Sequence, residues 1–243
     1  MDMGAQQGKF ILPIWLSPEA LLSKEQKAYL KALGFSPYLW LKNRFLYGKN
    51  APKYKELAWV NPDSIKYNLT QCVRQKMFGT LNIVSGTVIS GTWDEHVVPV
   101  NLKTKRDHWI GGFSWKELGV YDYKMGRVKL KGESDGCKNY EDVVARYERL
   151  DKLFETVKSE GRLRTQEELT GKKRTFARGR GEIEIFIDRN GSPIHGCGGT
   201  HRLAIAKILN LPVIPATWGG VHPEGIKHLH KYRNKPNSEQ KIT

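Results

Sequence analysis

Residues 181–217 read GEIEIFIDRNGSPIHGCGGTHRLAIAKILNLPVIPAT, and this stretch decides the fold that the sequence predicts. The β-branched and aromatic run at 183–187 predicts a strand. Residues 188–191, Asp-Arg-Asn-Gly, are typical of a tight reversal, and 193–195 form a second short strand. The first half of the stretch is therefore predicted to be a β-hairpin.

The second half predicts a helix followed by a strand. Thr200 is a suitable N-cap for the apolar helix of residues 203–209. Asn210 suits the left-handed position that ends a helix, and Pro212 prevents its continuation. Residues 213–216 are then a buried strand. The expected order is hairpin, glycine turn, helix and strand.

The glycines between hairpin and helix suggest an anion site. Without Cβ atoms, several backbone N–H groups can converge before a helix, whose dipole favours negative charge there. Two side chains of the first turn could add charge and hydrogen bonds to a phosphate. The alternative is a plain junction in which the glycines serve only packing. The combination favours a phosphate site at Gly198, Gly199, Thr200, His201 and Arg202.

The box Gly199-Thr200-His201-Arg202, followed by Leu203, Ala204 and Ala206, resembles the signature of the ParB/sulfiredoxin superfamily. Residues 147–161 are similar to the helix, ending in glycine, that precedes the hairpin in that family. Residues 59–62 resemble its first strand. The resemblance spans about residues 59–216, with long insertions. It implies a small mixed sheet that binds a nucleotide phosphate at the box.

The activities of that superfamily differ: members include CTP-binding DNA clamps, ATP-dependent sulfinic-acid reductases, ADP-dependent serine kinases and domains labelled nuclease. A reductase needs a cysteine nucleophile where this chain has Thr200, and a hydroxyl lacks thiolate character. A full DNA clamp needs a long region after the box, whereas a short tail follows Ala216. We therefore expect neither of these two activities.

The remaining expectation is a nucleotide-binding protein, a phosphotransferase or nucleoside triphosphatase that uses ATP, ADP or CTP with Mg²⁺. His201 would stabilise charge on the transferred group. Residues 86–95 read as a strand that delivers Asp94 and Glu95 at its end, where a carboxylate could act as base or Mg²⁺ ligand. Asp63 is a further candidate for that role, and these carboxylates could equally be solvated turn residues.

The alternative function is a nucleic-acid-binding module, ParB-like with a nuclease as one option, without phosphotransfer. It would use the basic loop before the hairpin, whose cations are Lys172, Lys173, Arg174, Arg178 and Arg180. A resident metal is not expected, because the spacing of His195, Cys197 and His201 matches no zinc pattern.

The composition bounds these readings. The chain has 243 residues, a net charge of +15 and a pI near 9.7, which favour a polyanionic partner or a phosphate-rich ligand. Its three widely spaced cysteines favour a reducing, cytoplasmic location over a disulfide framework. No apolar stretch approaches the ~20 residues of a membrane helix. The oligomeric state stays open.

We expect an α+β fold, a small mixed sheet with packed helices and an N-terminal helical extension. The extension and a basic linker occupy residues 1–55, the main domain 56–225, and a basic tail 226–243. An insertion at about 101–138 mixes cations with aromatic residues. Such a mixture suits either stacking on single-stranded bases or a satellite hydrophobic cluster.

Overall fold

The structure is a computed structural model that describes residues 38–70, 85–171, 182–196 and 198–235. The first helix expected in the N-terminal extension, the basic loop of residues 172–181, Cys197 and the end of the tail lie outside these ranges. The sequence predictions for them stay predictions.

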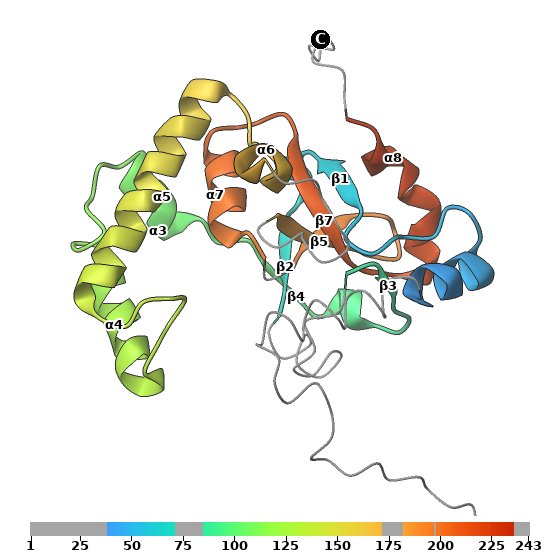
Figure 1. Ribbon diagram of the computed structural model, residues 1–243, viewed down its shortest axis with the longest axis horizontal. Helices are drawn as coiled ribbons and strands as arrows, with labels where there is room; N and C mark the ends of the chain where they lie inside the picture. The colour runs from blue at the N-terminus through green and yellow to red at the C-terminus, as the bar shows by residue number, and fades with distance from the viewer. Residues whose placement is uncertain (1–37, 71–84, 172–181, 197, 236–243) are drawn as a thin grey trace, which may run out of the picture.

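One mixed sheet of seven strands forms the centre of the described chain (Figure 1). Its strands are β1 (Leu57–Val60), β2 (Tyr67–Leu69), β3 (Thr87–Val88), β4 (Val97–Pro99), β5 (Ile183–Ile187), β6 (Pro193–His195) and β7 (Ile214–Val221). The strand order is β1-β7-β5-β6-β2-β4, and β3 pairs with the end of β7. β5 runs parallel to β7 and antiparallel to β6. The mixed sheet with packed helices confirms the predicted α+β class.

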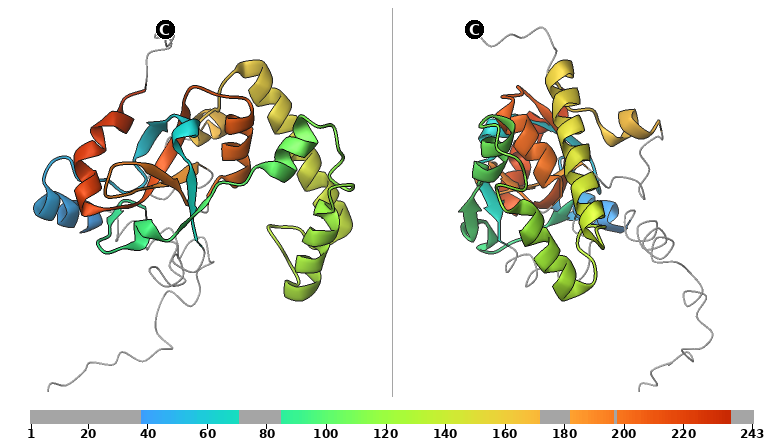
Figure 2. Two further views of the ribbon diagram at one scale, coloured as in Figure 1. Left: turned by 180° about the vertical axis from the view of Figure 1, so that it is seen from behind. Right: turned by 90° about the vertical axis from the view of Figure 1, so that its left-hand side faces the viewer.

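Helices cover the sheet and extend to one side of it (Figures 1 and 2). The α-helices are α3 (Lys103–Trp109), α4 (Val120–Lys131), α5 (Tyr140–Glu160), α6 (Gln166–Thr170), α7 (Thr200–Ile208) and α8 (His230–Arg233). Three 3₁₀ helices are η3 (Pro62–Ser64), η4 (Trp93–Glu95) and η5 (Pro223–His228). α3, α4 and α5 lie on one side of the sheet and α8 on the opposite side.

The predicted order of hairpin, glycine turn, helix and strand is confirmed, with two differences. Gly199 with a φ of 74°, rather than Thr200, is the N-cap of α7. A Cβ at Gly199 would lie 2.8 Å from the Cα of Ile183, so only glycine fits there. β7 also continues past the predicted end to Val221, because its last residues pair with β5 and with β3.

The two helices that precede the hairpin, α5 and α6, are bounded by local capping signals in the sequence. The Asn139 side chain accepts a hydrogen bond from the N–H of Asp142 at the start of α5, and Gly161, with a φ of 66°, ends it. In α6, Thr165 and Glu168 form a reciprocal capping box. These capping signals act between residues close together in the chain, so they can be recognised in the sequence without knowledge of tertiary packing.

The two faces of the sheet carry different cores. On one face, Ile183, Ile185 and Ile187 of β5 pack with α7 and the second half of α5. On the other face, Phe186 and Ile194 pack with residues that include Trp93. The alternation follows from the two-residue repeat of a strand. Any side chain of the hairpin can therefore be assigned to the α7 face or to the opposite face.

The insertion at 101–138 contains α3 and α4, which the sequence analysis did not anticipate. Its buried side chains form a third hydrophobic cluster with α5; the buried members are Trp115, Val128, Cys137, Val143 and Tyr147. Asp151 of α5 accepts hydrogen bonds from three ring N–H groups, those of His108, Trp109 and Trp115, at 2.9–3.1 Å. Of the two alternatives, the structure supports a satellite cluster for most of these aromatic residues.

The tail does not begin where the sequence placed it. Ile226 and Leu229 belong to the main core, although the tail was expected to start at residue 226. Arg233 of α8 donates from Nε to Glu56 Oε1 at 2.9 Å, beside β1. Glu56 also accepts from the indole N–H of Trp218 in β7 at 3.0 Å. Residues 226–235 are therefore part of the folded domain.

Residues 38–47 of the N-terminal extension are helical. Leu39 and Asn43 are its buried residues, and the Asn43 amide donates to the carbonyl of Gly86 at 2.8 Å. Phe45, on the outer side, is 89% exposed. Within the described ranges, no helix has the length and apolar character needed to cross a bilayer.

Trp115→Ala should lower the free energy of unfolding by roughly 3–5 kcal/mol, because Trp115 is buried and its loss leaves a cavity. Tyr123→Ala, in the same insertion but 66% exposed, should change it by about 0.5 kcal/mol or less. Urea unfolding followed by circular dichroism measures both. Equal effects would contradict the assignment of a third cluster.

Candidate functional site

The backbone of the glycine turn is held against β5. The N–H of Gly196 donates to the carbonyl of Glu184 at 2.8 Å, and the N–H of Glu184 donates to the carbonyl of Gly198 at 3.2 Å. His195 Nε2 donates to the same Gly198 carbonyl at 3.0 Å. A trans peptide directs its C=O and N–H in opposite directions. The N–H of Gly199 therefore points away from β5, and no acceptor for it lies among the described residues.

Close packing alone accounts for part of the glycine content. A Cβ at Gly196 would lie 2.5 Å from a carboxylate oxygen of Glu184, and one at Gly198 would lie 3.3 Å from the Glu184 Cβ. The packing alternative raised from the sequence is thus correct for these positions. It does not remove the outward Gly199 N–H or the helix dipole at the start of α7.

Two histidines flank the turn. His195 is buried, and its Nδ1 contacts the side-chain amide of Asn68 at 2.8 Å; burial lowers its pKa. Burial, helped by the nearby cations Lys105 and Arg146, lowers the pKa of His201 to about 4. His201 is therefore neutral at neutral pH. Its Nδ1 is buried and has no hydrogen-bond partner among the described residues.

Lys105 of α3 is a cation that the sequence analysis did not assign to this site. Burial lowers its pKa, and its charge acts on both His195 and His201. Among the described residues it has no hydrogen bond or ion pair. The sequence gives no local signal for it, because Lys105 stands in an ordinary basic run and its helix is seven residues long.

The Arg202 side chain is directed toward Glu182 and Arg164. Its NH1 donates to Glu182 Oε2 at 3.0 Å, and its NH2 donates to the carbonyl of Arg164. The two side chains are 10% and 1% exposed. The other oxygen of Glu182 accepts from the N–H of Gln166 at 2.7 Å. The phosphate-binding role predicted for Arg202 stays a prediction, and the structure gives this side chain a structural role.

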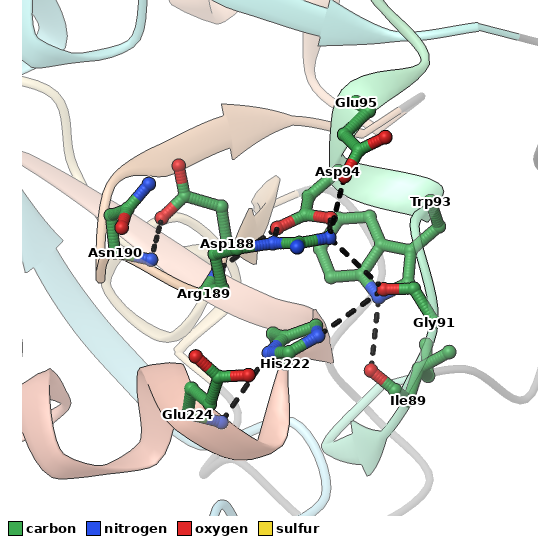
Figure 3. Close-up of polar contacts among 10 residues, drawn as sticks. All are labelled: Ile89, Gly91, Trp93, Asp94, Glu95, Asp188, Arg189, Asn190, His222 and Glu224. Carbon is green, nitrogen blue, oxygen red and sulfur yellow. Dashed lines mark hydrogen bonds and ion pairs between the residues drawn. The ribbon is translucent and has the colours of Figure 1, made fainter.

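Asp94 and Glu95 lie in η4 rather than at the end of a long strand, because β3 ends at Val88 (Figure 3). The Asp94 carboxylate accepts from Arg189 Nε at 2.8 Å and NH2 at 2.7 Å, and Glu95 Oε1 lies 3.0 Å from the same NH2. The hydrogen bonds from Arg189 lower the pKa of Asp94 to about 2. Asp94 is therefore a fully ionised, engaged carboxylate.

The structure does not bring these carboxylates to the glycine turn. Arg189 lies at the hairpin reversal, beyond the C-terminal end of β5, whereas Gly198 bonds to Glu184 near its N-terminal end. Trp93 packs on Phe186, on the face opposite α7. Asp63 lies 3.9 Å from Lys207, seven residues and about 10 Å along α7 from its start.

The network around Asp94 is internally satisfied (Figure 3). His222 accepts from the N–H of Glu224 at 3.3 Å and donates from Nε2 to the carbonyl of Gly91 at 3.2 Å. The indole N–H of Trp93 donates to Ile89 at 2.9 Å. Within the described part of the chain, no group of three His, Cys, Asp or Glu side chains could hold a metal ion. This network anchors the 89–95 segment to the hairpin.

Arg202→Ala should lower the free energy of unfolding by roughly 3–5 kcal/mol, because it leaves the Glu182 carboxylate buried without its counter-ion. Arg162→Ala is the matched control: it breaks an ion pair with Glu168 whose side chains are 48% and 39% exposed, and should cost about 1 kcal/mol or less. Urea denaturation at neutral pH compares the two. A similar small loss in both would refute the structural role of Arg202.

His201 should make the protein less stable in acid. The unfolded chain takes up a proton near pH 6.5, whereas folded His201 does so only near pH 4. Stability is therefore complete above pH 6.5 and falls as the pH drops toward 4, by roughly 3 kcal/mol at most. Thermal denaturation of wild type and His201→Leu across this range measures the difference. Parallel curves would show that His201 is not held neutral.

Comparison with known proteins does not extend these observations: no family model matches the chain, and no curated protein or solved structure matches it significantly. The resemblance to the ParB/sulfiredoxin superfamily, which depends on residues 199–206 above all, stays a prediction.

Proposed function

We propose that this protein binds a nucleotide by placing a phosphate at the start of α7, between the glycine turn and α3. One observation carries the proposal: Lys105 is partly buried, its charge lowers the pKa of both His195 and His201, and it forms no hydrogen bond or ion pair with any described residue. A desolvated cation without a partner costs free energy, which a bound anion would offset.

The backbone adds to this attraction. The N–H of Gly199 points away from the sheet, and the dipole of α7 contributes about 0.3–1 kcal/mol toward an anion at its start. Together, Gly198 to His201 supply backbone geometry and Lys105 supplies charge. The resemblance stated above supports ATP, ADP or CTP, accompanied by Mg²⁺, as the ligand.

The geometry favours binding over phosphoryl transfer. A general base must come within hydrogen-bond reach of the proton that it removes. Asp94 and Glu95, the expected bases, lie at the other end of the hairpin and are paired with Arg189. We therefore propose a nucleotide-binding protein, and catalysis would need a group other than these two.

Binding to a nucleic-acid backbone is the second candidate, favoured by the net charge of +15. The two can be separated by salt. Backbone binding releases counter-ions and weakens steeply with salt concentration, whereas a site for a single nucleotide responds less.

Lys105→Met should weaken binding of ATP, ADP or CTP by about tenfold or more, as expected for the loss of a charge-assisted hydrogen bond. The same change should raise the melting temperature slightly, because it removes a partly buried charge that has no partner among the described residues. Lys103→Met is the control, since Lys103 is 81% exposed on the same helix and pairs with Asp107. Calorimetry with Mg²⁺ present measures affinity. Equal affinities for the two variants would refute the site.

A further inference from the structure

The helix of residues 38–47 directs most of its apolar side chains outward. Leu41, Phe45 and Leu46 are 59%, 89% and 54% exposed, whereas Leu39 and Asn43 are buried. Leu41 and Phe45 are four residues apart, so their side chains lie next to each other on one face of the helix. None of the three exposed side chains belongs to a hydrophobic cluster formed by the described residues. Apolar side chains gathered on one exposed face are typical of a contact surface.

This helix is attached to the domain on the side opposite to that face. The Asn43 side-chain amide donates to the carbonyl of Pro52 at 3.0 Å and to the carbonyl of Gly86 at 2.8 Å. Figures 1 and 2 show the helix, in blue, at the end of the molecule near α8, with α4 at the opposite end. The face that carries Leu41 and Phe45 is therefore presented at one end of the molecule, away from the insertion.

Cations accompany the apolar side chains on this face. With 3.6 residues per turn, the exposed Lys42 and Arg44 lie on opposite sides of the line through Leu41 and Phe45. Between residues 38 and 55 the sequence contains no Asp or Glu, and it adds three lysines, at positions 49, 53 and 55. The cations of this segment make the face complementary to an anionic partner.

We propose that the outer face of the 38–47 helix docks on an anionic membrane surface. Leu41 and Phe45 enter the boundary between headgroups and acyl chains. Lys42 and Arg44 contact the lipid phosphates. An apolar stripe flanked by cations is typical of helices that lie in the plane of a membrane interface. The contact is separate from the proposed nucleotide site at the start of α7.

Two further observations favour a membrane over a second copy of the chain. Trp40 and Tyr47 are 39% and 37% exposed, and such rings, apolar with a polar tip, favour the headgroup level. In a symmetric contact between two copies, the face would meet itself and bring two sets of the same cations together. Anionic lipid neutralises these cations instead.

Vesicle flotation tests the proposal with the full-length protein. Vesicles contain phosphatidylcholine alone, or phosphatidylcholine with about 25% phosphatidylglycerol, at about 0.1 M salt. Wild type should bind the anionic vesicles about tenfold or more tightly than the neutral ones, because each cation near the surface adds attraction. Equal binding to both vesicles, or no binding to the anionic ones, would overturn the proposal, and the latter result would leave a protein partner as the occupant.

Substitutions with matched controls test the assignment to this helix. Phe45→Ser should weaken binding to the anionic vesicles about tenfold, as expected for the loss of an inserted ring. Leu130→Ser, 85% exposed on α4, should change binding by about twofold or less, because that helix lies at the other end of the molecule. Equal losses in the two variants would overturn the assignment.

A second matched pair tests the cations. Replacing Lys42 and Arg44 together by Gln should remove most of the preference for anionic vesicles. Replacing Lys129 and Lys131, two exposed cations of α4, by Gln should retain most of it. A preference that depends equally on both pairs would show that net charge, rather than this face, attracts the lipid.

Measurements without lipid test the other occupants of the face. Phe45→Ser should change the melting temperature by about 2 °C or less, because the side chain is exposed. A loss as large as that of Trp115→Ala would show that the protein's own chain covers the face, and would overturn the proposal. Sedimentation that reveals self-association abolished by Phe45→Ser would assign the face to a second copy. Neither result bears on nucleotide binding, so the proposed function is tested separately.

Discussion

The buried ion pair between Arg202 and Glu182 is the constraint on which the start of α7 depends. It ties the first turn of the helix to the beginning of β5, while Glu182 also holds the N–H of Gln166 and Arg202 holds the carbonyl of Arg164. Both charged side chains are buried, so removal of one would leave the other charge unpaired in an apolar interior. The Arg202 guanidinium is consequently engaged in holding the first turn of α7 against β5.

The part of the fold that the sequence could predict is the part set by near neighbours in the chain. Asn139 and Gly161 define α5, and Asn210, with a φ of 51°, follows α7 as expected. The length of β7 depends instead on pairing with segments distant in the chain, since its last residues pair with β3 and β5. α3 has no buried residue, so its sequence carries no apolar stripe to reveal it.

The candidate site, too, could be predicted from the sequence only where residues close together in the chain determine it. Residue types at the glycine turn indicated an anion site, but the partner of each side chain depends on contacts between distant segments. Arg202 could face a ligand or Glu182, and only the packing of β5 against α7 decides. Asp94 was expected near the box on the assumption of a shared sheet edge. The structure instead places it at the hairpin reversal, because β3 pairs in parallel with the last two residues of β7, Gly220 and Val221.

The two ends of the hairpin differ in how their charges are balanced. At the reversal, Asp94 and Arg189 neutralise each other, and His222 is hydrogen-bonded to the carbonyl of Gly91. The polar groups of this end are therefore engaged with one another. At the glycine turn, Lys105 forms no ion pair with a described residue, and the buried Nδ1 of His201 and Nε of Arg146 have no hydrogen-bond partner among the described residues. Buried polar groups are nearly always satisfied in folded proteins, so an unsatisfied group calls for an explanation such as an absent ion. The two ends of the hairpin therefore differ in polar pairing: the reversal is paired within itself, whereas buried polar atoms near the start of α7 have no partner among the described residues.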